Sequence, residues 1–273
     1  MRLSRWRTSV FVAVPALVLG LPSLSACQGA GSAEPPEAPA GRPSALGAGS
    51  RVLMIGNSLT SVNDVPAMVE ALADAAGLDW EVEAITTGGA SLQDHWLRES
   101  TVERVRQGSW DAVVLQQGPS SLPDSRINLR HWAAVIDAEV RAAGGRSSLY
   151  EVWPEQARLE VFDRVRDSYA LAAVDVGGNF LPAGEAWREA WRRDPGAPLY
   201  GPDAFHPSLA GSYAAALAIY AGLSGRTPIG LPAALQIEGG GTLSVPPPLA
   251  DLLQSAALQA VEDYRDYRPP DLP

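Results

Sequence analysis

Short apolar runs alternate with amphipathic segments along most of the chain. Each apolar run bounded by polar or turn residues predicts a buried strand, and such runs lie at 51–56, 80–87, 111–115, 148–153 and, more briefly, 174–176. Apolar positions at helical spacing predict helices at 64–76, 91–107, 128–143, 155–173, 184–191, 208–223 and 249–264. Residues 227–246 are rich in proline and glycine and predict a loop.

Strands and helices in this order predict one α/β domain with a three-layer, doubly wound, mostly parallel sheet. Functional sites in such sheets form beyond the carboxyl ends of the strands. Ser58, the pair Gly88-Gly89 and the pair Gln117-Gly118 each follow one of the first three predicted strands. We therefore expect these residues to meet at one edge of the sheet.

The N-terminus has the layout of a secretory signal. Three arginines and no acid precede an apolar stretch that runs to about residue 24 and ends in Leu24-Ser25-Ala26-Cys27. Pro15, Gly20 and Pro22 interrupt that stretch, which is too short to span a membrane. The Leu-Ser-Ala-Cys ending resembles the lipobox of bacterial lipoproteins, which implies lipid attachment at Cys27. Because Cys27 is the only cysteine, no internal disulfide can form.

That resemblance implies an exported chain, lipid-anchored to a bacterial membrane on its periplasmic or cell-surface side. Gln28 rather than aspartate follows the cysteine, which by analogy favours the outer membrane of a Gram-negative cell. Residues 28–50 are mostly Gly, Ala, Pro, Ser and Glu and predict a flexible tether. The folded domain is then expected at 51–273, a size that suits one α/β domain.

The charges exclude several kinds of function. All 21 basic residues are arginine, so a Walker A lysine, a Schiff-base lysine and a Ser-Lys dyad are impossible. Without residues 1–27 the chain keeps 18 arginines against 31 acidic residues, a formal net charge of −13. Nucleic acid is therefore not expected as a partner, because it needs a basic surface.

Ser58, Asp203 and His206 are the residues with candidate chemistry. A serine hydroxyl is inert at neutral pH unless a base takes its proton, and a neutral histidine needs an acceptor to fix its tautomer. Asp203 lies three residues before His206, so a loop or helical turn can bring both to one side. The other histidines, His95 and His131, fall in predicted helices and are expected at surface or half-buried positions, and their spacing predicts no metal site.

Together these segments resemble the SGNH (GDSL-like) hydrolase family over roughly residues 52–223. Gly56-Asn57-Ser58-Leu59 resembles the first block of that family, Gly88-Gly89-Ala90-Ser91 the second, and Asp203-Ala204-Phe205-His206-Pro207 the last. The resemblance implies a flavodoxin-like sheet, a catalytic triad of Ser58, His206 and Asp203, and no metal or organic cofactor. It also implies a serine esterase. Gly184-Glu185-Ala186-Trp187 resembles a branch of the family whose members are exported and often associated with sugars.

One block departs from the family. Its third block is Gly-x-Asn-Asp, whose asparagine donates to the oxyanion, but here Gly118 is followed by Pro119 and Ser120. The expected oxyanion donors are therefore the N–H groups of Ser58 and Gly89 and a side chain of Gln117 or Ser120, with Gln116 as a further candidate.

The expected substrate is a small-molecule or carbohydrate ester, with O-acetylated carbohydrate first and a simple carboxylic ester next; thioesters and phospholipids stay open. The altered third block motivates an alternative, a weakly active or inactive binding module for a carbohydrate or a partner. A metal-dependent hydrolase is a third possibility. The aromatic residues that follow the later strands could line an acyl or sugar pocket, although core positions are more common for them, and Glu185 is expected to be solvated; these aromatics are Trp153, Trp187, Trp191 and Tyr200.

Overall fold

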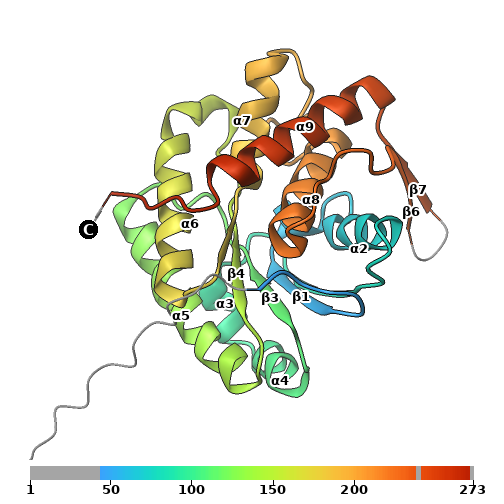
Figure 1. Ribbon diagram of the computed structural model, residues 1–273. Coiled ribbons are helices and arrows are strands. Elements are labelled where there is room, and N and C mark those ends of the chain that lie inside the picture. The colour runs from blue at the N-terminus through green and yellow to red at the C-terminus, as the bar shows by residue number, and fades with distance from the viewer. Residues whose placement is uncertain (1–43, 238–240, 271–273) are drawn as a thin grey trace, which may run out of the picture. The chain divides into compact units, whose positions relative to one another are not determined.

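The computed structural model describes residues 44–237 and 241–270. Five parallel strands form the central sheet in the order β2-β1-β3-β4-β5 (Figure 1). This order confirms the predicted doubly wound, flavodoxin-like sheet. From β1 the chain adds β2 on one side and β3 on the other, and sheets of this kind place their sites at this point, beyond the carboxyl ends of β1 and β3. The strands are β1 (Arg51–Gly56), β2 (Glu81–Thr86), β3 (Ala112–Leu115), β4 (Ser147–Tyr150) and β5 (Asn179–Leu181).

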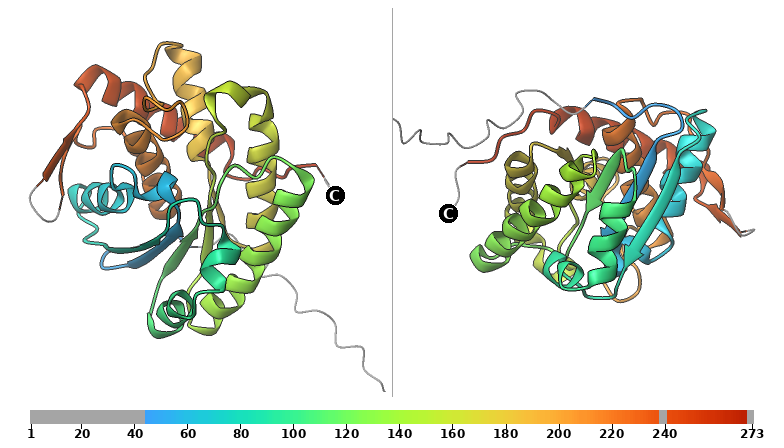
Figure 2. Two further views of the ribbon diagram at one scale, coloured as in Figure 1. Left: turned by 180° about the vertical axis from the view of Figure 1, so that it is seen from behind. Right: turned by 90° about the horizontal axis from the view of Figure 1, so that it is seen from below.

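Helices cover both faces of the sheet (Figures 1 and 2). On one face lie α2 (Val65–Ala75) and α8 (Leu209–Ser224), with α7 (Ala183–Arg193) and α9 (Pro247–Asp263) packed on α8. The other face carries α5 (Pro123–Ala142) and α6 (Phe162–Val176), with the short α3 (Leu92–Trp96) and α4 (Glu99–Gln107) beside α5. The one-turn α1 (Ser58–Ser61) follows β1 directly. The sheet is therefore covered by helices on both faces, as in a three-layer fold.

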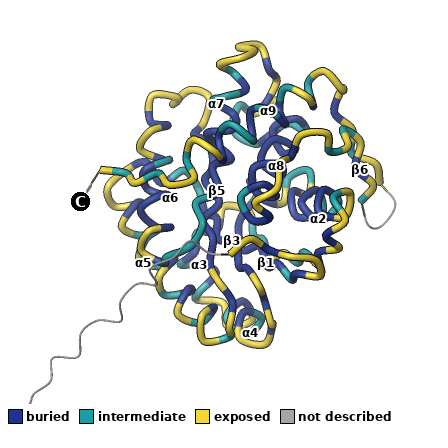
Figure 3. Tube along the Cα trace, viewed as in Figure 1, coloured by how far each residue is buried: buried dark blue, intermediate teal, exposed yellow. Residues whose placement is uncertain are grey.

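Burial is deepest in the inner strands and in α8 (Figure 3). All residues of β3 are buried, which explains why the strand is a continuous apolar run without alternation. Helix α8 is buried almost all round because α9 covers the side that faces away from the sheet. It begins at the N-cap Ser208, whose Oγ accepts the N–H of Gly211 at 3.1 Å. A buried helix thus fixes the chain two residues after His206.

Most predicted elements are present, with four corrections. The helix predicted at 91–107 is two helices, because Arg98 has extended backbone dihedrals between α3 and α4. The strand predicted at 174–176 is wrong: these residues end α6, and β5 begins three residues after Val176. Gly177, with φ of +60°, ends α6 in the left-handed conformation that glycine favours. The helix expected from residue 155 begins instead as a 3₁₀ turn, η1 (Gln156–Val161).

The fourth correction concerns the segment predicted as a loop at 227–246. It contains two antiparallel strands, β6 (Ala234–Ile237) and β7 (Gly241–Ser244), and β6 contacts α2. The prolines on either side of these short strands hid their pattern. The start of the domain also differs from the predicted boundary at residue 51. Leu46 is buried and donates its N–H to the Leu223 carbonyl at 2.9 Å, so the end of the predicted tether packs on the domain.

The expected signal segment, the lipid-bearing Cys27 and the tether up to residue 43 lie outside the described residues. Among the residues that are described, no helix is long and apolar enough to cross a membrane.

Candidate active site

Ser58, His206 and Asp203 form a hydrogen-bonded series at the carboxyl end of the sheet. His206 Nε2 lies 2.9 Å from Ser58 Oγ, and His206 Nδ1 lies 2.5 Å from Asp203 Oδ2. Because the carboxylate can only accept, Nδ1 carries a proton toward Asp203 and Nε2 is left to accept from the serine. The three predicted residues therefore meet in the geometry that activates a serine hydroxyl.

The loop from Gly201 to His206 holds the acid and the imidazole in place. Asp203 Oδ1 accepts the N–H groups of Phe205 at 3.1 Å and His206 at 2.9 Å, so one carboxyl oxygen serves the backbone and the other serves the ring. The hydrogen bond from His206, followed by those from the two backbone N–H groups, lowers the pKa of Asp203 to about 2. Gly201 donates its N–H to the His206 carbonyl at 2.7 Å and closes the loop. Asp203 is therefore ionised over the whole working range of an imidazole base.

Ser58 is presented by a tight turn between β1 and α1. Asn57 is the N-cap of α1, with its Oδ1 accepting the Leu59 N–H at 3.0 Å and its Nδ2 donating to the Ala90 carbonyl at 3.1 Å. The turn is thus tied to the glycine-bearing segment after β2. Asn57 does here the structural work of an N-cap, which asparagine and aspartate do about equally well.

Gln116, the residue after β3, is fully buried beneath this turn. Its Oε1 accepts the Asn57 N–H at 2.9 Å and the Thr60 hydroxyl at 2.8 Å, and its Nε2 donates to Asn57 Oδ1 at 3.1 Å and to the Gln117 carbonyl at 2.5 Å. Both amide N–H groups are used, so Gln116 has none to give an oxyanion. The sequence offered Gln116 as a donor, but its contacts make it the support of the Ser58 turn.

Gln117 and Ser120 both line the site, but they differ in the hydrogen-bond donors that they have free. Gln117 Oε1 accepts the Leu92 N–H at 3.1 Å, and its Nε2 donates one hydrogen to Ser120 Oγ at 3.0 Å, which leaves a second N–H. Ser120 Oγ donates its only hydrogen to the Gly118 carbonyl at 3.2 Å. Gln117 therefore has a hydrogen-bond donor to spare and Ser120 has none in this arrangement.

A cavity of about 380 Å³ lies beside Ser58. Gly89 has φ of +70°, which few residues except glycine adopt readily, and it contributes backbone to the wall. Within the described part of the chain, no hydrogen bond uses the N–H of Ser58 or Gly89. Most of the remaining wall is small or polar, and its lining residues include Ala90, Ser91, Pro119, Ser125, Asn128 and Phe205.

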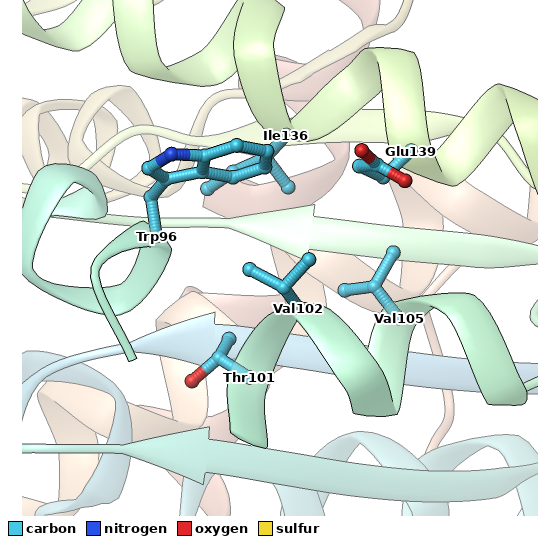
Figure 4. A pocket seen from close by; sticks show the side chains of 6 residues that line it. All are labelled: Trp96, Thr101, Val102, Val105, Ile136 and Glu139. Carbon is cyan, nitrogen blue, oxygen red and sulfur yellow. The ribbon is translucent and has the colours of Figure 1, made fainter. Parts of the chain in front are cut away.

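A much smaller hollow between α3, α4 and α5 is not a candidate site (Figure 4). Its volume of about 10 Å³ is barely enough for one water molecule. The cavity of about 380 Å³ beside Ser58, by contrast, has room for an acyl group.

His95 does not lie at the surface or half-buried position that the sequence predicts. It is fully buried rather than half-exposed, and its Nε2 lies 2.8 Å from the carbonyl of Gly56, immediately before the Ser58 turn. A carbonyl can only accept, so Nε2 carries a proton, and burial lowers the pKa of His95, which favours the neutral ring. Its position on α3, one turn after the capping residue Ser91, was the available signal. His131 is exposed, as a surface position predicts.

Glu185 was also misplaced, since it is buried rather than solvated. Its backbone N–H donates to Oε2 of Glu151 at 3.1 Å, and its carboxylate accepts from Arg188 Nη1 at 3.0 Å. Glu151 is fully buried, and its Oε1 has no partner among the described residues. Burial, followed by the charge of Glu185, raises the pKa of Glu151 well above its usual range. Burial also raises the pKa of Glu185, but the charge of Arg188 opposes that rise, so we assign the shared proton to the more deeply buried Glu151.

The four aromatic residues considered as pocket walls divide into two pairs. Trp153 and Trp187 are fully buried and stack with ring centroids 3.6 Å apart, so they are core residues. Trp191 and Tyr200 are half-buried and line a different hollow from the one beside Ser58. In the described part of the chain, no group of three or more His, Cys, Asp or Glu side chains could hold a metal ion.

Comparison with solved structures finds proteins that share this fold. A proposed SGNH hydrolase from Slackia heliotrinireducens is 29% identical with a TM-score of 0.55, over 64% of this chain and 98% of its own. A DUF4886 family protein from Bacteroides uniformis is 20% identical with a TM-score of 0.67, over 82% of this chain and 98% of its own. A catalytic mutant of an acetylxylan esterase from Geobacillus stearothermophilus is 20% identical with a TM-score of 0.52, over 66% of this chain and 96% of its own.

No family model and no curated protein sequence matches the chain. The parallel sheet in the order 2-1-3-4-5 and its similarity to these structures define an α/β protein with the fold of ester hydrolases. The chain therefore has the fold of SGNH (GDSL-like) hydrolases, and its ordered sequence blocks resemble those of that family.

Proposed function

We propose that this protein is a serine esterase whose triad is Ser58, His206 and Asp203. The observation that carries the proposal is the continuous series from Ser58 Oγ through the His206 ring to Asp203, with contacts of 2.9 and 2.5 Å. No step of the proposed reaction requires a metal or an organic cofactor.

In the first step His206 Nε2 takes the proton of Ser58 Oγ as that oxygen forms a bond to the acyl carbon. Asp203 stays ionised and stabilises the imidazolium through Nδ1–H. The tetrahedral intermediate then breaks its bond to the alcohol, and Nε2 returns the proton to the departing oxygen. Water repeats the sequence on the acyl-serine, releasing the acid and restoring Ser58.

The negative oxygen of the intermediate needs donors aimed at one point in the cavity. The N–H groups of Ser58 and Gly89 supply two, and the second amide N–H of Gln117 supplies the third. Gln117 thus takes the role that asparagine has in the third block of the family. The side chain comes from the end of the same strand, β3, but two positions after Leu115.

An O-acetyl group on a carbohydrate is the proposed substrate. A cavity of about 380 Å³ with many small and polar lining residues suits a short acyl group better than a long chain. Acetylxylan esterases are among the structures with this fold. The lipobox-like ending at Cys27 supports an exported, lipid-anchored enzyme, which would meet extracellular polysaccharides.

The decisive experiment is turnover of p-nitrophenyl acetate and of acetylated xylan by the purified full-length protein and its Ser58→Ala variant. We expect released acetate from the wild type and only residual rates from the variant. Turnover that Ser58→Ala leaves unchanged would refute the serine mechanism, and no turnover of any ester would favour a binding module. Activity abolished by a chelator would instead favour a metal-dependent hydrolase.

A further inference from the structure

An open hollow, separate from the cavity beside Ser58, lies on the other side of the loop that carries Asp203 and His206. Its volume is about 520 Å³, within the range of small-molecule sites. Gly201 lines this hollow and donates its N–H to the His206 carbonyl, whereas Phe205 lines the cavity beside Ser58. Gln156, also in the lining, donates its backbone N–H to the Ala204 carbonyl at 2.9 Å. One six-residue loop therefore separates the two hollows.

Two aromatic rings form the fixed part of this second hollow. Trp191 and Tyr200 lie nearly parallel, at an interplanar angle of 28° with centroids 5.6 Å apart. Trp191 Nε1 donates to the Ala197 carbonyl at 3.0 Å and the Tyr200 hydroxyl to the Pro154 carbonyl at 2.6 Å. Their polar atoms are thus satisfied inside the protein, and the rings are held in one orientation before any ligand arrives, which lowers the entropic cost of binding.

The two rings connect to the catalytic loop through the core. Both stand edge-on to Trp187, at 84° for Trp191 and 82° for Tyr200. Trp187 stacks on Trp153, whose Nε1 donates to the Phe205 carbonyl at 3.0 Å. The hollow and the His206 loop therefore share one packed aromatic support.

The lining has the chemistry of a saccharide site. None of its residues in the described part of the chain carries a charge, so neither an anion nor a cation finds a counter-charge there. Rings and prolines provide apolar surface, while the Gln156 amide and exposed backbone provide hydrogen-bond partners. A pyranose has this combination, with C–H groups on its faces and hydroxyls at its edge, and its C–H faces suit the electron-rich faces of aromatic rings.

We propose that the hollow lined by Trp191 and Tyr200 binds an uncharged sugar unit, adjacent to the unit that carries the ester. The proposal rests on the proposed esterase function for its kinetic consequence, but the binding itself does not require turnover. A chain that reaches across the Gly201–His206 loop would occupy both hollows, so a glycan would be held more tightly than a single sugar ester.

The test uses calorimetric titration of the full-length protein with unacetylated xylotetraose, cellotetraose and chitotetraose. We expect at least one to bind, and Trp191→Ala to weaken that binding roughly tenfold, as the loss of an aromatic contact does. Leu159→Asp changes a rim residue that is 44% exposed, so it should keep the fold and also weaken binding. Trp132→Ala, a half-buried tryptophan of α5 outside the hollow, is the matched control and should bind as the wild type does.

A kinetic measurement adds a second readout. Trp191→Ala and Leu159→Asp should raise KM for an acetylated oligosaccharide roughly tenfold and alter kcat/KM for p-nitrophenyl acetate much less, because the small ester does not reach the hollow lined by Trp191 and Tyr200. Trp132→Ala should leave both quantities unchanged. Absence of oligosaccharide binding, equal binding by Leu159→Asp and wild type, or binding of octanoate in place of sugars would overturn the proposal. Oligosaccharide binding that Leu159→Asp weakens, without turnover of any ester, would support this site and refute the esterase function. Ester turnover by a protein that binds none of the oligosaccharides would support the esterase function and refute the sugar site.

Discussion

His206 Nε2 lies 2.9 Å from Ser58 Oγ, although 148 positions separate the two residues in the chain. Ser58 follows the buried strand β1, and His206 precedes the buried helix α8. Both flanking elements belong to the core, so the contact depends on the most constrained parts of the fold rather than on the tips of long loops. A contact of this kind is preorganised for proton transfer.

Substitutions in the triad should reduce ester turnover without unfolding the protein. For Ser58→Ala and for His206→Gln we expect kcat to fall by at least about a thousandfold, and for Asp203→Asn by up to about 10⁴, because the imidazole loses its orienting acceptor. Rates on p-nitrophenyl acetate, with thermal melting of each variant as the folding control, check this. Wild-type rates in His206→Gln would show that another group is the base.

The pH dependence should have a single limb on its acid side. His206 must be neutral to accept the Ser58 proton, so kcat/KM should rise with pH as the imidazole deprotonates. Asp203 should contribute nothing between pH 4 and 8, because its pKa of about 2 keeps it ionised there. A profile that is flat from pH 5 to 8 in the wild type would argue against His206 as the base.

Gln117 and Ser120 can be separated by their effects on kcat. Removing one oxyanion donor typically lowers kcat by about 10²–10³ with little change in KM, and we expect this of Gln117→Ala. Ser120→Ala should cost less, because the Ser120 hydroxyl hydrogen is given to the Gly118 carbonyl. The two variants should be compared on one ester under saturating conditions. A larger loss in Ser120→Ala would assign the donor to the serine.

A methyl group at Gly56 should disturb the Ser58 turn from below. A Cβ there would lie 2.5 Å from Thr60 Oγ1 and closer still to Gln116 Oε1, which is well inside van der Waals contact. We expect Gly56→Ala to lower the free energy of unfolding by about 1–3 kcal/mol and to reduce kcat, because Gln116 must move away from Asn57. Gly47→Ala, where a Cβ would meet nothing within 4 Å, is the matched control for thermal melting. Equal melting temperatures for the two variants would contradict the proposed crowding.

Glu151 should make stability depend on pH. Its pKa is raised by burial in the folded protein, so folding retains a proton that the unfolded chain releases above its usual pKa of about 4.5. This contribution is complete below that value and is lost as the pH rises through the raised pKa. Glu151→Gln has no such proton to lose, and we expect its Tm at pH 8 to exceed that of the wild type by roughly 2–4 °C, the shift for about 1 kcal/mol. The gain should shrink toward pH 5.

Glu189→Gln provides the opposite sign as a control. Hydrogen bonds from Arg192, followed by those from Arg193, lower the pKa of Glu189, so its charged form stabilises the fold at neutral pH. Its replacement should therefore lower Tm slightly at pH 8. If Glu151→Gln melts below the wild type at pH 8, the carboxyl is ionised in the folded protein and the assignment of the proton is wrong.

The sheet was predictable because its strands carry their own signal. Buried parallel strands must be apolar along their whole length, and 51–56 and 111–115 read that way in any context. Strands in the second half of the chain were harder to predict. The valines at 174 and 176 favour strands by local propensity, yet they end α6, because a glycine two residues before β5 stops the helix there. The β6–β7 hairpin was missed since its strands have only four residues each.

The sequence by itself determined the chemistry that the chain offers: a serine after the first strand, an Asp-x-x-His just before the predicted helix at 208–223, and no lysine anywhere. Such features are local, and residue identity and spacing carry them. Only the tertiary structure decided which amide supports the Ser58 turn and which keeps a free N–H, and that His95 and Glu185 are buried. Those outcomes depend on which side chains from distant segments compete for the same hydrogen bonds and the same space, and neither spacing nor composition records that competition.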